Sequence, residues 1–93
     1  MAKYKIEISS TAERQLKKIN REDQIRILRS ISLLAQNPRP DGCRKLKGYK
    51  DVYRIRIGNY RVIYEIDGTK IVVTILKIGH RRDIYHSLRH KPG

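Results

Sequence analysis

Hydrophobic and polar residues alternate from Asp51 to Gly79, and this pattern leaves few alternatives to an antiparallel sheet. A period of two residues is typical of strands that bury one face. The dipeptides Gly58-Asn59 and Asp67-Gly68 interrupt the run, and both suit two-residue hairpin loops, which require positive φ angles. The run therefore predicts a three-stranded meander.

The alternation assigns the side chains of the meander to two faces. One face is hydrophobic and should pack against helices; it comprises Tyr53, Ile55, Ile57, Tyr60, Val62, Tyr64, Ile66, Ile71, Val73 and Ile75. With two-residue loops at both turns, Arg56 lies opposite Arg61, and Arg61 lies opposite Thr74, on the other face. Like charges directly opposite each other destabilise a sheet by ~0.2 to 1 kcal/mol. Two interpretations stay open: a chance pair on a basic surface, or a preorganised phosphate site.

The N-terminal segment predicts one strand and a first helix. Residues 4–8 alternate in polarity and place Tyr4, Ile6 and Ile8 on one face of a strand. Ser10 precedes Glu13 by three positions, the spacing of a capping box, so we expect a short helix to begin there.

A second helix should follow, with Asn20 as its N-cap and acidic residues in its first turn. Its buried stripe is expected to be Ile25, Leu28, Ile31 and Ala35, widened by Ile27 and Leu34. Asn37-Pro38 should end it. These elements predict a single α+β domain over residues 1–93, with a mainly antiparallel four-stranded sheet in the order β-α-α-β-β-β and two N-terminal helices on one face.

The chain is strongly basic, with 22 Lys and Arg against 9 Asp and Glu, for a net charge of +13. Residues 44–93 hold 13 of the basic and 4 of the acidic side chains, so most of the excess is in the second half. Such a charge favours RNA, DNA or an acidic protein as partner. No run of apolar residues has the length of a membrane span.

Composition also limits the chemistry. Cys43 is the one cysteine, so an intramolecular disulfide or a cysteine zinc site is not expected, which suits a reducing cytoplasm. The nine acidic residues are scattered, so we expect neither a magnesium site nor a cofactor.

A basic segment follows the last strand and contains His80, Arg81, Arg82 and Tyr85. It would reach the row of Arg56 and Arg61 only if the chain curled back after Gly79. Otherwise His80 belongs to a solvated tail and Tyr85 packs against the sheet.

The segments YRIRIGNYRVIY (residues 53–64) and KIGHRRDIY (residues 77–85), with LKGY at residues 46–49, resemble the RelE/ParE toxin superfamily, in particular its RelE-type branch. This resemblance implies a small cytoplasmic toxin held inactive by an acidic, RelB-like antitoxin in a hetero-oligomer. RelE-type members are endoribonucleases that cut messenger RNA on the ribosome.

Carried over by position, the resemblance implies basic active-site residues at Arg54 and Arg56, a phosphate-binding residue at Arg61, and further catalytic residues at Arg81 and Tyr85; His80 is added to the catalytic residues by the chemistry of proton transfer. The RNA contacts that we expect beside them are Lys45, Lys47, Lys50, Arg54 and Arg82. RelE itself has Lys at the positions of Arg54 and Arg56, and a guanidinium is a poor general base at neutral pH. His80 is then the candidate acid or base, Arg56 and Arg61 stabilise the transition state, Arg81 assists the leaving group, and Tyr85 stacks on or orients a base.

Two other functions share these features. A ParE-like inhibitor of DNA gyrase would have the same fold and would act by binding a protein. A non-catalytic basic module would bind RNA without forming product.

Overall fold

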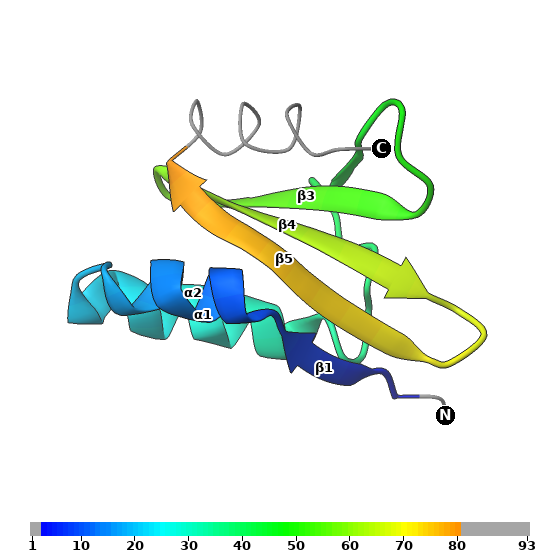
Figure 1. Ribbon diagram of the computed structural model, residues 1–93, viewed down its shortest axis with the longest axis horizontal. Helices are drawn as coiled ribbons and strands as arrows, with labels where there is room; N and C mark the ends of the chain where they lie inside the picture. Colours follow the sequence, from blue (N-terminus) through cyan, green and yellow to red (C-terminus); the bar gives the residue numbers. More distant parts are fainter. Residues whose placement is uncertain (1–2, 81–93) are drawn as a thin grey trace.

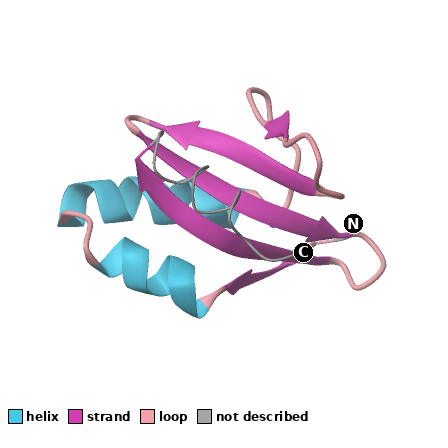
Figure 2. Cartoon of the chain, turned by 45° about the horizontal axis from the view of Figure 1, so that its top comes forward, coloured by secondary structure: helices cyan, strands magenta, loops and turns pink. Residues whose placement is uncertain are grey.

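The computed structural model describes residues 3–80, which form two layers. A five-stranded sheet has the strand order β1-β5-β4-β3-β2, and helices α1 (Ser10–Lys17) and α2 (Arg21–Leu33) cover one of its faces (Figures 1 and 2). The strands are β1 (Lys5–Ile8), β2 (Arg44–Lys45), β3 (Val52–Ile57), β4 (Tyr60–Asp67) and β5 (Val72–His80). The predicted α+β class and the helices on one face are confirmed. The sheet has one strand more than predicted, because the short strand β2 pairs with β3.

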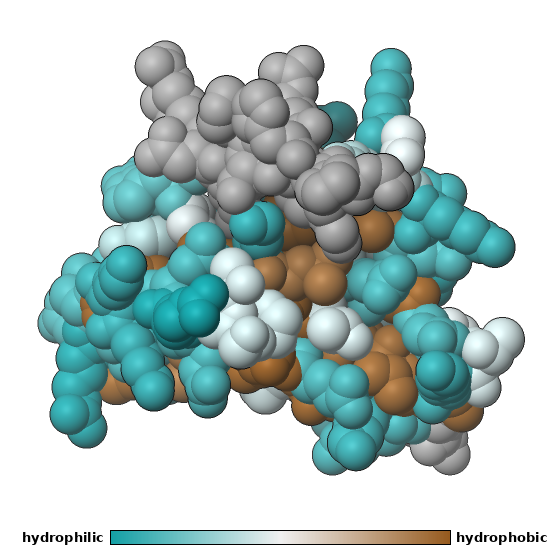
Figure 3. All heavy atoms as spheres, viewed as in Figure 1, coloured by the Kyte–Doolittle hydropathy of each residue, from teal (hydrophilic) through white to brown (hydrophobic). Residues whose placement is uncertain are grey.

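The main core lies between the helices and the sheet. Its fully buried members include Ala12, Ile27, Val62, Tyr64 and Ile75. The predicted hydrophobic face of the meander is confirmed except at Ile71, which is exposed in a loop. Hydrophilic side chains cover much of the outer surface of the helical layer (Figure 3).

Two details of the helices differ from the prediction. The N-cap of α1 is Ser9, whose Oγ accepts a hydrogen bond from the Ala12 N–H, so the helix is capped one residue before the predicted Ser10, and Ala12 has no side-chain acceptor to complete a capping box. Asn20 caps α2 as predicted, and its Oδ1 accepts from the Asp23 N–H. The buried stripe of α2 is centred on Ile27 and Ile31, whereas Ile25 and Leu28 are exposed.

The second turn of the meander is longer than predicted. Asp67 pairs with Val72, so residues 68–71 form the loop. Oδ1 of Asp67 accepts hydrogen bonds from the backbone N–H of Thr69 and Lys70 and from Thr69 Oγ1. These bonds, that of the Thr69 hydroxyl foremost, lower the pKa of Asp67. The carboxylate therefore closes a loop of a different length from the one that Asp67-Gly68 suggests.

This longer loop changes the register of β4 and β5. Glu65 lies opposite Thr74, and a bulge between Ile63 and Tyr64 shifts the pairing further, so that Arg61 lies opposite Gly79. The prediction that Arg61 lies opposite Thr74 is therefore wrong.

The pairing of β5 with β1 ends at Ile75, and side chains of Ser9 and of helix α1 bind the residues of β5 that follow. Ser9 Oγ donates to the Leu76 carbonyl at 3.1 Å, and Gln15 Oε1 accepts from the Ile78 N–H at 2.7 Å. These contacts fix the strand beside the bulge and set the direction in which β5 reaches Gly79.

Candidate phosphate-binding site

The hairpin of β3 and β4 places two arginines side by side. Gly58 has φ of +60°, which allows the tight loop Gly58-Asn59, and the register then sets Arg56 opposite Arg61 as predicted. Ile55 and Val62, the neighbours of Arg56 and Arg61 along their strands, belong to the core under the helices. Since successive side chains of a strand alternate, both arginines lie on the face away from the helices.

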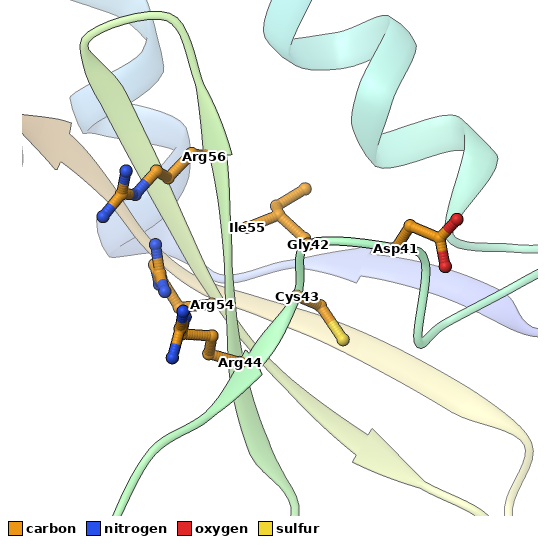
Figure 4. A pocket seen from close by; sticks show the side chains of 7 residues that line it. All are labelled: Asp41, Gly42, Cys43, Arg44, Arg54, Ile55 and Arg56. Atoms are coloured by element: carbon orange, nitrogen blue, oxygen red, sulfur yellow. The ribbon is translucent and has the colours of Figure 1, made fainter.

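Strand β2 adds a second arginine pair that the sequence analysis did not find. Arg44 lies opposite Arg54 at the edge of the same face. Figure 4 shows the guanidinium groups of Arg44, Arg54 and Arg56 on one side of the β2 and β3 ribbons, while Ile55 points to the other side. Only 5% of Arg54 is exposed, whereas Arg44 and Arg56 are exposed. Because β2 has two paired residues and no alternating hydrophobic pattern, hydrophobic periodicity does not reveal it.

A hollow of about 490 Å³ lies beside these arginines. It is lined by Asp41, Gly42, Cys43, Arg44, Arg54, Ile55 and Arg56, and it opens where the pairing of β2 with β3 ends. The Asp41 side chain points away from the three guanidinium groups (Figure 4). The side of the hollow that carries the arginines is therefore suited to an anion.

The end of β5 completes this face. Gly79 lies opposite Arg61 and contributes no side chain to this face. Lys77 lies opposite Ile63, which is itself opposite Arg54, so a half-buried ammonium group occurs on the same face. Next to the arginines is a small hydrophobic cluster of Val52 and Ile63, with Leu46, Tyr49 and Leu76 packed against it.

His80 is on the other face of the sheet. It pairs with Tyr60, and the two ring centroids are 4.7 Å apart. Tyr60 packs against the core under the helices, so the His80 ring lies on the helix side, whereas Arg61 lies on the opposite side. The structure does not bring His80 together with the arginines, contrary to the expectation from the sequence. Arg81, Arg82 and Tyr85 lie outside the described residues.

The three predicted lysine contacts are spread along the edge of the sheet. Lys45 pairs with Tyr53, which packs on the helix side, so its alternation places it away from Arg44. Lys47 and Lys50 are exposed in the segment between β2 and β3, and Lys50 lines a separate hollow with Asp51 and Glu65. Of the predicted RNA contacts within residues 3–80, only Arg54 joins the arginine rows.

Four guanidinium groups on one face can bind phosphates through paired N–H donors. Among residues 3–80, no three His, Cys, Asp or Glu side chains are grouped so that they could hold a metal ion. Within the same range, no helix is long and apolar enough to cross a membrane.

Comparison with known proteins identifies the family. The family described as "ParE toxin of type II toxin-antitoxin system, parDE" matches residues 6–85, which is most of the chain. The chain belongs to the RelE/ParE toxin superfamily. Its curated relatives carry RelE-type names, so it is of the RelE type within this superfamily.

Two of these relatives cover nearly the whole chain. Putative toxin RelE1 of Methanocaldococcus jannaschii is 31% identical over 86 residues, 89% of this chain and 96% of the relative. Toxin RelG of Mycobacterium tuberculosis is 31% identical over 87 residues, 88% of this chain and 95% of the relative. Among solved structures, the RelE-RelB complex of Pyrococcus horikoshii is similar, with 31% identity, a TM-score of 0.77, and coverage of 88% of this chain and 98% of that one.

Proposed function

We propose that this protein is a type II toxin that cleaves messenger RNA on the ribosome without a metal ion. The observation that carries the proposal is the pair of opposed arginines, Arg56 and Arg61, on the sheet face away from the helices. Two guanidinium groups held opposite each other can both donate hydrogen bonds to one reacting phosphate, where negative charge develops.

The proposed reaction is attack of a ribose 2′-oxygen on the adjacent phosphorus. The new P–O2′ bond forms as the P–O5′ bond breaks, which gives a 2′,3′-cyclic phosphate and a free 5′-hydroxyl. Negative charge grows on the non-bridging oxygens during this step. Arg56 and Arg61 would stabilise that charge, and one such donor is worth ~2.7 to 4 kcal/mol in other enzymes.

Two protons must also move: one leaves the 2′-hydroxyl and one reaches the departing 5′-oxygen. The sequence suggested His80 for this step, but its contact with Tyr60 directs it away from Arg61. We therefore propose that residues after His80 act in this step, with Arg81 assisting the leaving group and Tyr85 orienting or assisting the attacking ribose. Lys45, Lys47, Lys50 and Arg82 would contribute general attraction to RNA.

The proposed partner in the resting state is an acidic, RelB-like antitoxin, with which the toxin would form a hetero-oligomer in the cytoplasm. Support comes from the similar P. horikoshii protein, whose structure is that of a RelE-RelB complex. The net charge of +13 would attract an acidic chain, and a flexible segment could order on this preformed surface.

We expect the product of the adjacent reading frame to co-purify with the toxin and to relieve its growth arrest. Affinity should fall as salt is added, because exposed charges are screened. Binding can be measured by calorimetry at two salt concentrations. A neighbouring gene product that neither binds nor relieves arrest would contradict the proposed partner.

A second function, inhibition of DNA gyrase, is favoured by one observation: the matching family is described as ParE toxin. One experiment separates the two. Purified toxin is mixed with ribosomes programmed with a messenger, and product ends are identified chemically, while gyrase supercoiling is assayed in parallel. The ribonuclease proposal expects a cyclic phosphate and normal supercoiling. Inhibited supercoiling with intact messenger would assign the protein to the gyrase inhibitors, and RNA affinity without product would indicate a non-catalytic binding module.

A further inference from the structure

We infer that Arg44 and Arg54 form a second phosphate subsite, which binds the phosphodiester next to the one held by Arg56 and Arg61. This inference rests on the proposed function, because it treats Arg56 and Arg61 as the site of the reacting phosphate. It assigns Arg44 to the binding of substrate and extends the contact with RNA to two consecutive phosphates.

The register places the two pairs in adjacent rows. Arg44 lies opposite Arg54, and Arg56 lies opposite Arg61. Arg54 and Arg56 are two residues apart on β3, so their rows are separated by about 6.7 Å along the strand. This is the scale on which consecutive phosphates of one RNA strand are spaced. Two rows on one face can therefore bind two phosphates of the same ribose.

The burial of Arg54 makes the row of Arg44 and Arg54 suitable for specific binding. Only 5% of Arg54 is exposed, so neighbouring atoms restrict its guanidinium, whereas Arg44 is exposed at the edge strand. The two side chains point to the same side of the sheet in Figure 4. An anion between them would gain charge-assisted hydrogen bonds from both guanidinium groups.

The hollow of about 490 Å³ beside Arg44 has room for the nucleotide that such a phosphate carries. Among the described residues of its lining the acidic one is Asp41, and it points away from the guanidinium groups (Figure 4). The expected ligand is thus a nucleotide with phosphates on both the 3′ and 5′ oxygens of its ribose.

The test uses the full-length toxin and two probes, adenosine 3′,5′-bisphosphate and adenosine 5′-monophosphate, with equilibrium binding measured by calorimetry. Arg44→Gln should weaken the bisphosphate about tenfold, as expected for the loss of one hydrogen bond to a charged group, and the monophosphate less than twofold. Arg61→Ala should weaken both probes. Arg29→Gln removes the same charge from the exposed surface of α2 and should change neither.

Salt dependence gives a second measurement on a short 2′-O-methyl RNA, which cannot be cleaved. The slope of log K against log salt should fall by ~0.7 in Arg44→Gln, the value for one phosphate contact on a single strand. Equal losses for both probes, an unchanged slope, or a loss confined to antitoxin binding would overturn the inference. Since neither measurement requires cleavage, a toxin that binds both phosphates yet cuts no messenger would contradict the proposed reaction and not the subsite.

Discussion

Arg61→Ala is expected to slow single-turnover cleavage of ribosome-bound messenger by about 10² to 10³. The lost guanidinium would no longer balance the charge that grows on the phosphoryl oxygens. Stability should change by less than about 1 kcal/mol, because Arg61 is half-buried and faces the like charge of Arg56. Growth arrest on induction should disappear for the same reason.

The matched control is Arg29→Ala, which removes the same charge from the exposed surface of α2. It should leave both the cleavage rate and the melting temperature close to those of the parent chain. Cleavage at the parent rate by Arg61→Ala would remove the arginine pair from the reaction. A melting temperature lowered by many degrees would instead show that Arg61 has a structural role.

The first hairpin shows what the sequence could predict. Gly58-Asn59 has one favoured loop, and the loop length fixes the register that sets Arg56 opposite Arg61. The dipeptide Asp67-Gly68 suggests a two-residue loop of the same kind at the second turn, but that loop has four residues. The Asp67 carboxylate binds the backbone of Thr69 and Lys70, and Ile71 takes a φ of 58°, which a β-branched residue rarely adopts. Nothing in a pattern of hydrophobic and polar residues could anticipate that conformation.

The candidate site was predicted only in part, because some of its residues are positioned by local sequence patterns and others by tertiary contacts. Arg54, Arg56 and Arg61 follow from strand alternation and the first loop, whereas Arg44 depends on the short strand β2, which tertiary pairing stabilises. The side on which His80 lies depends on a bulge between Ile63 and Tyr64 and on the contacts of Ser9 and Gln15 with β5. Ser9 and Gln15 are each more than 60 positions from the β5 residues that they contact, so local sequence patterns do not reveal these contacts.

The second large effect is expected from a comparison of neighbouring residues at the end of β5. Arg81→Ala should slow cleavage by ~10² to 10³, the range for loss of a donor that stabilises charge growing in the transition state, here on the leaving oxygen. His80→Gln should slow it less than about tenfold, because the His80 ring contacts Tyr60 on the helix side of the sheet. Both rates are measured in single-turnover cleavage of a messenger on programmed ribosomes.

Binding must be measured in the same variants, because a slow rate alone does not separate chemistry from affinity. Attraction to ribosomal and messenger RNA depends on many Lys and Arg side chains, so each single change should alter it only slightly. A large loss of rate in His80→Gln with unchanged binding would mean that His80 leaves Tyr60 and reaches the phosphate during the reaction. The proton-transfer role would then belong to His80, and the register of β4 and β5 would have to change when RNA binds.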